Sequence, residues 1–189
     1  MAFLKEAKEW AAKEGESEVV HHYTKTDVNS FMPFSHFGTH QAARERAASM
    51  EFDPGKSQVH SVRIKLGNTV HIPDLGGHYP EEIASGLREH GHITDEDHQH
   101  LKTKFATFNQ QLEKPTRDDR SWLHPEQQAK ASYLAHYLRN KKGIHTISYE
   151  NDQEDEGSTS YMITHHSQVR KLRKSSSPKI NIPRGWKDY

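Results

Sequence analysis

Segments typical of strands lie towards both ends of the chain, and segments typical of helices lie between them. Residues 18–24 form a short strand-like run, and residues 59–66 place apolar side chains at every second position, the period of a half-buried strand. Near the other end, β-branched and aromatic residues at 144–149 and 160–163 flank a loop that contains glycine. Strands separated by inserted helices indicate an α+β fold.

The predicted helices have clear start and stop signals. Pro80 begins one that ends at Gly91, and Thr94 caps the next, with Asp97 at the capping-box position and an apolar stripe up to residue 112. A further helix covers residues 126–140 and ends at Gly143. Shorter predicted elements are helices at 3–14 and 41–48, a strand at 70–72 and a charged loop at 114–120.

Length and composition favour one domain with appendages. The chain has 189 residues, an apolar content of 32% and a mean hydropathy of −1.02, so much of it must be surface or loop. We expect residues 1–16 to form an N-terminal amphipathic helix and residues 17–170 to form the domain. Residues 171–189 carry an excess of Lys and Arg and are expected to form a basic, flexible tail or a merely solvated extension.

Overall charge and residue usage narrow the function classes. The 26 basic and 26 acidic residues balance, so no global field draws the protein to nucleic acid or membrane. The lack of cysteine excludes disulfides and thiolate chemistry. Because no apolar run reaches the roughly 18 residues of a spanning helix, and no signal-peptide core is evident, a cytoplasmic protein without a membrane partner is expected.

Residues 151–158, the acidic loop, contain the most distinctive chemistry. Asp152, Glu154, Asp155 and Glu156 lie together in this loop, followed by Gly157. A solvated hairpin loop has the same composition. A loop between two strands is also a way to present a carboxylate at the mouth of a cleft.

Two further motifs lie near the N-terminal end. His22 and Thr24 are two residues apart in a strand-like run and therefore share a face, whereas His21 lies on the other. The segment Ser35-His-Phe-Gly-Thr39 then leads into the alanine-rich helix at 41–48. With the acidic loop before Gly157-Ser158, these motifs resemble the ADP-ribosyltransferase-like domains of bacteriophages and phage polyvalent proteins, distant relatives of bacterial toxin ADP-ribosyltransferases.

The resemblance runs in order from about Val19 to Val169. In the middle, two strand-like segments followed by Pro-Asp-Leu-Gly at 73–76 look like the corresponding family segment, and Tyr149-Glu-Asn-Asp-Gln-Glu154 resembles its Tyr-x-Asn-x-x-Glu signature. It implies split mixed or antiparallel sheets around an NAD cleft with inserted helices. It also implies NAD as co-substrate, a phage or toxin context, and transfer of ADP-ribose to a macromolecular acceptor, a host protein first and a nucleic acid second.

The implied chemistry requires a fixed carboxylate. Breaking the bond between nicotinamide and ribose builds positive charge on the anomeric carbon, as in glycoside hydrolysis. A carboxylate that faces this carbon stabilises the transition state more than the ground state. By its position in the motif, Glu154 is the implied catalytic residue, and Asp152, two residues earlier, resembles an acceptor-binding acid. Three residues and Ser158-Thr159 separate Glu154 from its strand, unlike the toxin relatives, which leaves the acceptor preference open.

The resemblance also implies a set of NAD-binding residues. His22 is expected to bond the ribose next to nicotinamide, with Thr24 in the same pocket wall, and Phe37 to Thr39 to form a turn on which nicotinamide stacks. Relatives often place a tyrosine near the following helix, where this chain has Arg46. Either Tyr23, Phe37 or Tyr149 takes its place, or the stacking on nicotinamide is weaker. The complete implied cofactor-binding set is His22, Tyr23, Thr24, Phe37, Gly38, Thr39, Tyr149 and Ser158.

Other functions are also compatible with the sequence. Water as acceptor would give an NAD glycohydrolase, and a catalytically weak relative would be a binding or inhibitor protein. A third class is nucleic-acid binding through the basic tail, with affinity that falls steeply with salt. The 16 histidines do not indicate a metal site, because His98 and His100 face different directions on a helix and no His-Glu-x-x-His run exists. No metal is expected.

Overall fold

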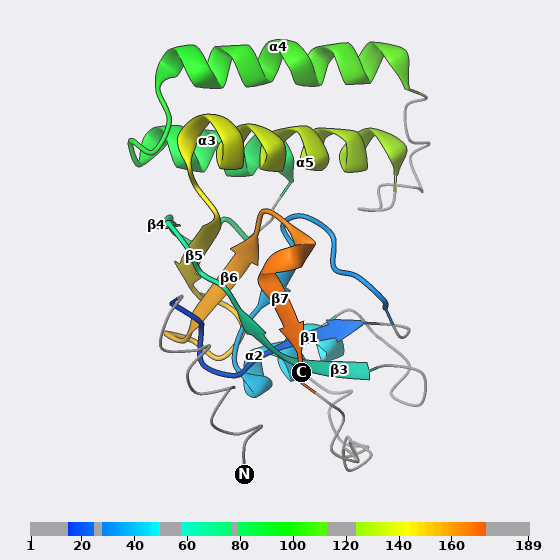
Figure 1. Cartoon of the computed structure of the whole chain (residues 1–189), viewed down its shortest axis with the longest axis vertical. Helices are drawn as coiled ribbons and strands as arrows, with labels where there is room; N and C mark the ends of the chain where they lie inside the picture. Colours follow the sequence, from blue (N-terminus) through cyan, green and yellow to red (C-terminus); the bar gives the residue numbers. More distant parts are fainter. Residues whose placement is uncertain (1–14, 25–27, 50–57, 77–78, 113–123, 173–189) are drawn as a thin grey trace.

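The computed structural model describes residues 15–24, 28–49, 58–76, 79–112 and 124–172. This part of the chain contains a three-stranded antiparallel sheet of order β1-β3-β7 and a four-stranded mixed sheet of order β2-β6-β5-β4. The α+β class is therefore confirmed (Figure 1). The bounds of the strands are β1 Val20–Thr24, β2 His36–Phe37, β3 Gln58–Ile64, β4 Thr69–His71, β5 Thr146–Glu150, β6 Thr159–Ile163 and β7 Val169–Lys171.

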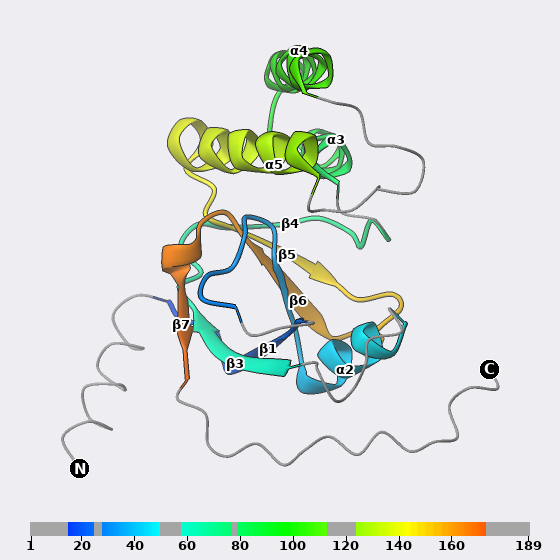
Figure 2. The ribbon, with the colours of Figure 1, turned by 90° about the vertical axis from the view of Figure 1, so that its right-hand side faces the viewer.

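Three helices form a layer on one face of the four-stranded sheet. They are α3 (Pro80–Glu89), α4 (Asp95–Gln111) and α5 (Pro125–Tyr137), and α4 lies farthest from the sheet in Figure 2. The capping box of Thr94 and Asp97 forms as predicted, with Asp97 N donating to Thr94 Oγ1. Helix α5 continues into a π-helical turn, Leu138–Lys142, which ends at Gly143 with a left-handed φ of 65°.

The four-stranded sheet is covered on both faces. Because strand side chains alternate, Ile147 and Met162 pack against the helical layer, whereas Ile163 packs against the three-stranded sheet. The larger core contains Ile83, Leu87, Leu101, Leu134 and Leu138 from the helices, and the smaller one contains Val20, Phe31, Phe37, Val62 and Ile64. This arrangement gives two sheets that face each other across an apolar layer.

Strand β2 joins the two sheets. It pairs with β6, with Phe37 opposite Tyr161, and the next residue, Gly38, exchanges two backbone hydrogen bonds with His21 of β1 at 2.8 and 3.1 Å. A Cβ at Gly38 would lie 2.4 Å from Ser160 Oγ. Only glycine lets β1, β2 and β6 approach this closely without displacing Ser160.

Helix α2 (His40–Ser49) begins directly after this junction and packs beside β1. Thr39 accepts a hydrogen bond from Ala42 N at 3.0 Å and so caps its N-terminus. Ala42, Ala43 and Ala47 form its buried face. Their small side chains let α2 lie close to the strands, which brings its polar face next to the loop between β5 and β6.

The predicted elements agree with the observed ones except at the C-terminal side. The tail is predicted to begin at residue 171, but β7 extends to Lys171 and pairs with β3. Arg170 forms an ion pair with Glu16, 3.2 Å apart, so it belongs to the domain. The predicted helix at 3–14, the loop at 114–120 and most of the tail lie outside the described residues. None of the described helices is long and apolar enough to cross a membrane.

Substitution of Gly38 tests this junction. We expect Gly38→Ala to lower the free energy of unfolding by about 1–3 kcal/mol, because the new methyl group overlaps Ser160 Oγ. In a Ser160→Ala background the nearest remaining atom of residue 160 is Cβ at 3.7 Å, so the same substitution should be less destabilising. Denaturant unfolding of the four proteins measures the difference. An equal loss in both backgrounds would contradict the close contact.

Candidate functional site

Asn151 closes the acidic loop. Its backbone N–H donates to Ser158 O at 2.9 Å, and its buried side-chain amide donates to Ser158 Oγ and Ser160 Oγ at 2.8 and 2.9 Å. Inside the loop, Ser158 N donates to Asp155 O, and Asp155 has a left-handed φ of 46°. Asn151, the asparagine of the segment Tyr149–Glu154, therefore joins the two ends of the acidic loop by hydrogen bonds.

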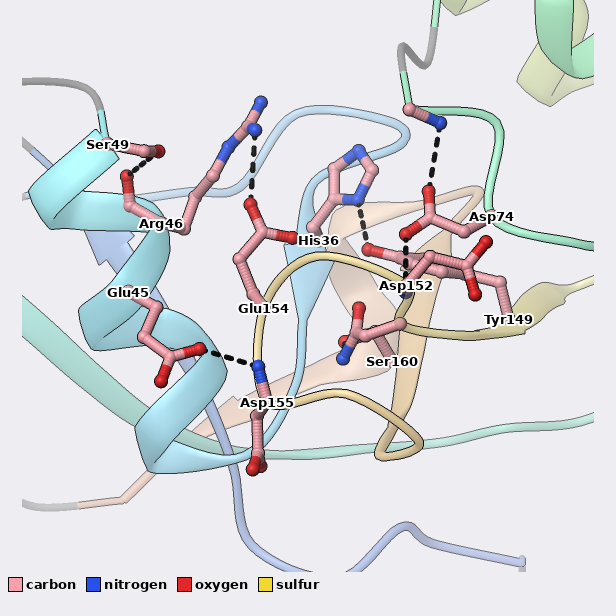
Figure 3. Close-up of polar contacts among 12 residues, drawn as sticks. His36, Glu45, Arg46, Ser49, Asp74, Tyr149, Asp152, Glu154, Asp155 and Ser160 are labelled. Atoms are coloured by element: carbon pink, nitrogen blue, oxygen red, sulfur yellow. Dashed lines mark hydrogen bonds and ion pairs between the residues drawn. The ribbon is translucent and has the colours of Figure 1, made fainter. Parts of the chain in front are cut away.

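Helix α2 holds the acidic loop by contacts with two of its residues. Arg46 Nη1 lies 3.2 Å from Glu154 Oε1, and the Asp155 N–H donates to Glu45 Oε2 at 2.6 Å. Thr39 Oγ1 donates a short hydrogen bond to Asp155 Oδ2. Figure 3 shows the Glu154 carboxylate facing the Arg46 side chain across the space between loop and helix. Glu154 is therefore fixed at the edge of the domain, with its side chain 19% exposed.

Asp74 supports the other end of the loop. Its Oδ2 accepts from Asp152 N at 3.2 Å and its Oδ1 accepts from Gly76 N at 3.0 Å, as drawn in Figure 3. The Pro-Asp-Leu-Gly segment thus connects directly to the acidic loop. Asp152 itself is exposed to solvent.

His22 lies between the two sheets. Its ring packs against Phe31 and Phe37, with ring centroids 5.3 and 5.1 Å away, and Nδ1 lies 2.5 Å from His36 O. A carbonyl oxygen only accepts, so Nδ1 carries the proton. Burial lowers the pKa of His22 to about 4, the bond to His36 opposes this shift, and the charge of His60 adds to it. His22 is consequently neutral at pH 7, with an unprotonated Nε2.

Thr24 and Tyr23 lie on β1 with His22. Thr24 Oγ1 is 2.9 Å from Nε2 of the buried His60 on β3. Thr24, which is predicted to share a face of its strand with His22, thus contacts the neighbouring strand on that face. Tyr23 is half-buried. His21, which we expected on the opposite face, contacts Ser61 at 3.2 Å and the ring of His40.

Three predicted cofactor-binding residues have structural roles that do not fit the prediction. Phe37 has no exposed surface and packs in the smaller core, so its ring offers no face on which nicotinamide can stack. The close approach of Ser160 already accounts for glycine at position 38. Tyr149 is 5% exposed, and its hydroxyl group lies 2.7 Å from His36 Nδ1. Its side chain lies on the face of the four-stranded sheet that the helices cover, whereas His22 lies on the opposite side of this sheet. Burial raises the pKa of Tyr149 above its usual value.

Thr39 and Ser158 have identifiable local functions. Thr39 caps α2 and bonds Asp155, and Ser158 receives the Asn151 amide. Both position the acidic loop. A direct contact of either side chain with NAD stays a prediction.

Sequence segments far apart in the chain meet at this site. The β2 residue His36 contacts His22 through its carbonyl oxygen and Tyr149 through its ring, and Thr39 connects the same segment to the acidic loop. Within the described ranges, no hydrogen bond or ion pair joins His22 directly to Glu154. Sequence reasoning missed His36, Glu45 and Asp74 as loop and strand supports, because their partners lie far away in the sequence and leave no local pattern.

Comparison of the chain with family models, with curated proteins and with solved structures finds no match. The site must therefore be interpreted from its own residues. In the part of the chain that the structure describes, no group of three or more His, Asp or Glu residues could hold a metal ion.

The buried neutral state of His22 makes stability depend on pH. Its pKa is about 4 in the folded protein and near 6.5 in the unfolded chain. As the pH falls, His22 is therefore protonated in the unfolded chain before it is protonated in the folded protein, which favours unfolding. Its contribution is fully present above pH 6.5 and is lost as the pH falls towards 4. We expect His22→Gln to reduce the dependence of unfolding free energy on pH in this window by up to about 1.4 kcal/mol per pH unit. Denaturant unfolding at several pH values measures it, and an unchanged slope would contradict the assignment.

Proposed function

We propose that this protein is an NAD-dependent mono-ADP-ribosyltransferase. It cleaves the bond between nicotinamide and ribose and transfers ADP-ribose to a macromolecular acceptor. The observation that supports this most is the convergence of the motif segments: His22, the turn at 36–39 and the acidic loop are connected by hydrogen bonds and packing. The fold, an ADP-ribosyltransferase-like pair of sheets around NAD, is part of the same proposal.

Glu154 is the proposed catalytic residue. Its carboxylate is fixed by a loop that α2, Asn151 and Asp74 hold from different sides. A carboxylate held in this way needs little reorganisation when positive charge develops on the anomeric carbon. The two electrons of the broken bond leave with nicotinamide, and a nucleophilic atom of the acceptor forms the new bond to the anomeric carbon and releases a proton.

Arg46 holds Glu154 by an ion pair. In this pair the guanidinium Nη1 lies 3.2 Å from the carboxylate Oε1. The Arg46 side chain is 55% exposed, so it has room to turn away from Glu154. In the proposed mechanism it then faces the pyrophosphate of NAD, which a guanidinium matches in charge and shape.

His22 is the proposed ribose-binding residue. With the proton on Nδ1 bound to His36 O, its Nε2 is an acceptor that no described residue occupies. A ribose hydroxyl can donate to this nitrogen. The buried rings of Phe31 and Phe37 fix the imidazole, so that Phe37 acts by positioning His22 rather than by stacking on nicotinamide. Tyr23, the other aromatic residue predicted to bind NAD, follows His22 directly on β1, so its side chain points to the opposite face of the strand.

Asp152 is the proposed acceptor-binding residue. It is exposed, two residues before Glu154, in a loop whose backbone Asp74 fixes. A protein side chain is the favoured acceptor and a nucleic-acid base the second. NAD hydrolysis follows from the same site if water takes the place of the acceptor.

One observation favours a second candidate function, a relative that binds a partner and catalyses weakly. The aromatic rings of Phe37 and Tyr149 are buried, and Arg46 stands where relatives have a tyrosine. Nicotinamide would then have a poor stacking surface. This candidate predicts weak or absent NAD binding. A third candidate, nucleic-acid binding by the tail, predicts an affinity for nucleic acid that does not depend on Glu154.

Labelled NAD tests the proposal. The protein, Glu154→Gln and His22→Ala are each incubated with NAD and a bacterial lysate, and nicotinamide release and label on macromolecules are followed. We expect Glu154→Gln to reduce release by at least about 100-fold, as for loss of one transition-state stabilising group. We expect His22→Ala to raise the NAD concentration needed for half-maximal release.

Glu156→Gln provides the matched control, because Glu156 is an exposed acid of the same loop. Its release rate should equal that of the unaltered protein. Equal loss in Glu154→Gln and Glu156→Gln would show that loop charge, not the Glu154 position, matters. Absence of both release and NAD binding in the unaltered protein would leave the partner-binding candidate.

A further inference from the structure

An open cavity lies where the C-terminal part of the helical layer meets the end of β6. Its volume is about 510 Å³, and it is lined by α5, by the π-helical turn, by Thr164 and His165 after β6, and by Pro33 before β2. Cavities of roughly 300–1,000 Å³ are typical of small-molecule sites. The acidic loop precedes the start of β6 and this cavity follows its end, so the two are separated by the length of a strand, about 16 Å.

The polar groups around this cavity favour an anion. Among the described residues that line it, none is acidic, whereas Arg139, His136 and His165 carry or can accept positive charge. Arg139 forms no hydrogen bond or ion pair with any described residue, although it is half-buried. A guanidinium has five N–H donors in a planar fork that matches a phosphate group.

His165 supplies a second donor. Its Nδ1 accepts from Ser167 N at 3.2 Å, so the neutral ring carries its proton on Nε2. Burial lowers the pKa of His165, and the neighbouring charges of His166 and Arg139 lower it further. His165 is thus a neutral ring near the Arg139 guanidinium, and its Nε2–H can donate to an anion that the guanidinium binds.

The chain conformation at this cavity is itself unusual. Arg139 and Asn140 belong to the π-helical turn Leu138–Lys142, and Asn140 donates to the His136 ring at 3.0 Å. π-Helical turns are rare in proteins and occur frequently at functional sites. The turn contributes the Arg139 guanidinium and the Asn140 amide to the wall of the cavity, and α5 contributes the His136 imidazole.

We infer that this cavity binds a small phosphate-bearing molecule, with the Arg139 guanidinium as the principal phosphate ligand and His165 Nε2 and the Asn140 amide as further donors. The site is distinct from the proposed NAD site and does not depend on it. Its volume accommodates a nucleoside monophosphate, and the hydroxyl of Ser132 on the same wall adds a polar contact for the remainder of the ligand.

Amide NMR of the full-length, isotope-labelled protein tests this site. Inorganic pyrophosphate and AMP are titrated to millimolar concentration, with adenosine as the phosphate-free comparison. We expect saturable shifts of the Arg139, Asn140 and His165 amides with pyrophosphate and AMP and no such shifts with adenosine. Arg139→Ala should weaken binding by about 10- to 100-fold, the effect of losing a charge-assisted hydrogen bond.

Arg88→Ala is the matched control, since Arg88 lies on α3 and pairs with Glu89 outside the cavity. Its affinity should be unchanged. The inference fails if the shifts map to the acidic loop and residues 22–39 instead, if adenosine acts like AMP, or if Arg139→Ala binds normally. Stronger binding of a single-stranded oligonucleotide than of AMP, falling steeply with salt, would overturn it in favour of a nucleic-acid surface.

Discussion

The close approach of β1, β2 and β6 at Gly38 is the constraint on which the rest of this structure depends. Backbone bonds to His21 on one side and contact with Ser160 on the other tie the three-stranded sheet to the four-stranded one. The next residue, Thr39, caps α2 and bonds Asp155. One short segment therefore sets the distance between the sheets, the start of a helix and the position of the acidic loop.

The fold could be predicted from local patterns where these patterns are strong. Alternation at residues 59–66, the capping box of Thr94 and Asp97, and the glycine stop at 143 correspond to observed elements. Strand β7 was not predicted, because Arg170 and Lys171 have the composition of a tail. Its register is set by pairing with β3 and by the ion pair of Arg170 with the buried carboxylate of Glu16. The π-helical turn was missed too, because its residues suit an ordinary helix.

The site was predictable as a set of segments but not as a set of contacts. The motif at 149–154 predicts the acidic loop as the site, and the structure shows that the Asn151 side chain closes this loop by hydrogen bonds to Ser158 and Ser160. Phe37 was assigned to a stacking surface because an aromatic residue beside glycine offers one, but the three-dimensional packing of Phe31 and His22 around it decides otherwise. Arg46 and Glu154 are 108 residues apart, so no spacing rule connects them.

The proposed transferase requires the segments around Gly38 to form one NAD site, with His22 and Glu154 at the same ribose. A crystal structure of Glu154→Gln grown with NAD examines this directly, because the substitution preserves shape while slowing turnover. We predict the nicotinamide ribose within hydrogen-bonding distance of His22 Nε2 and beside residue 154. A dinucleotide bound away from both residues, or none at saturating NAD, would contradict the proposed site.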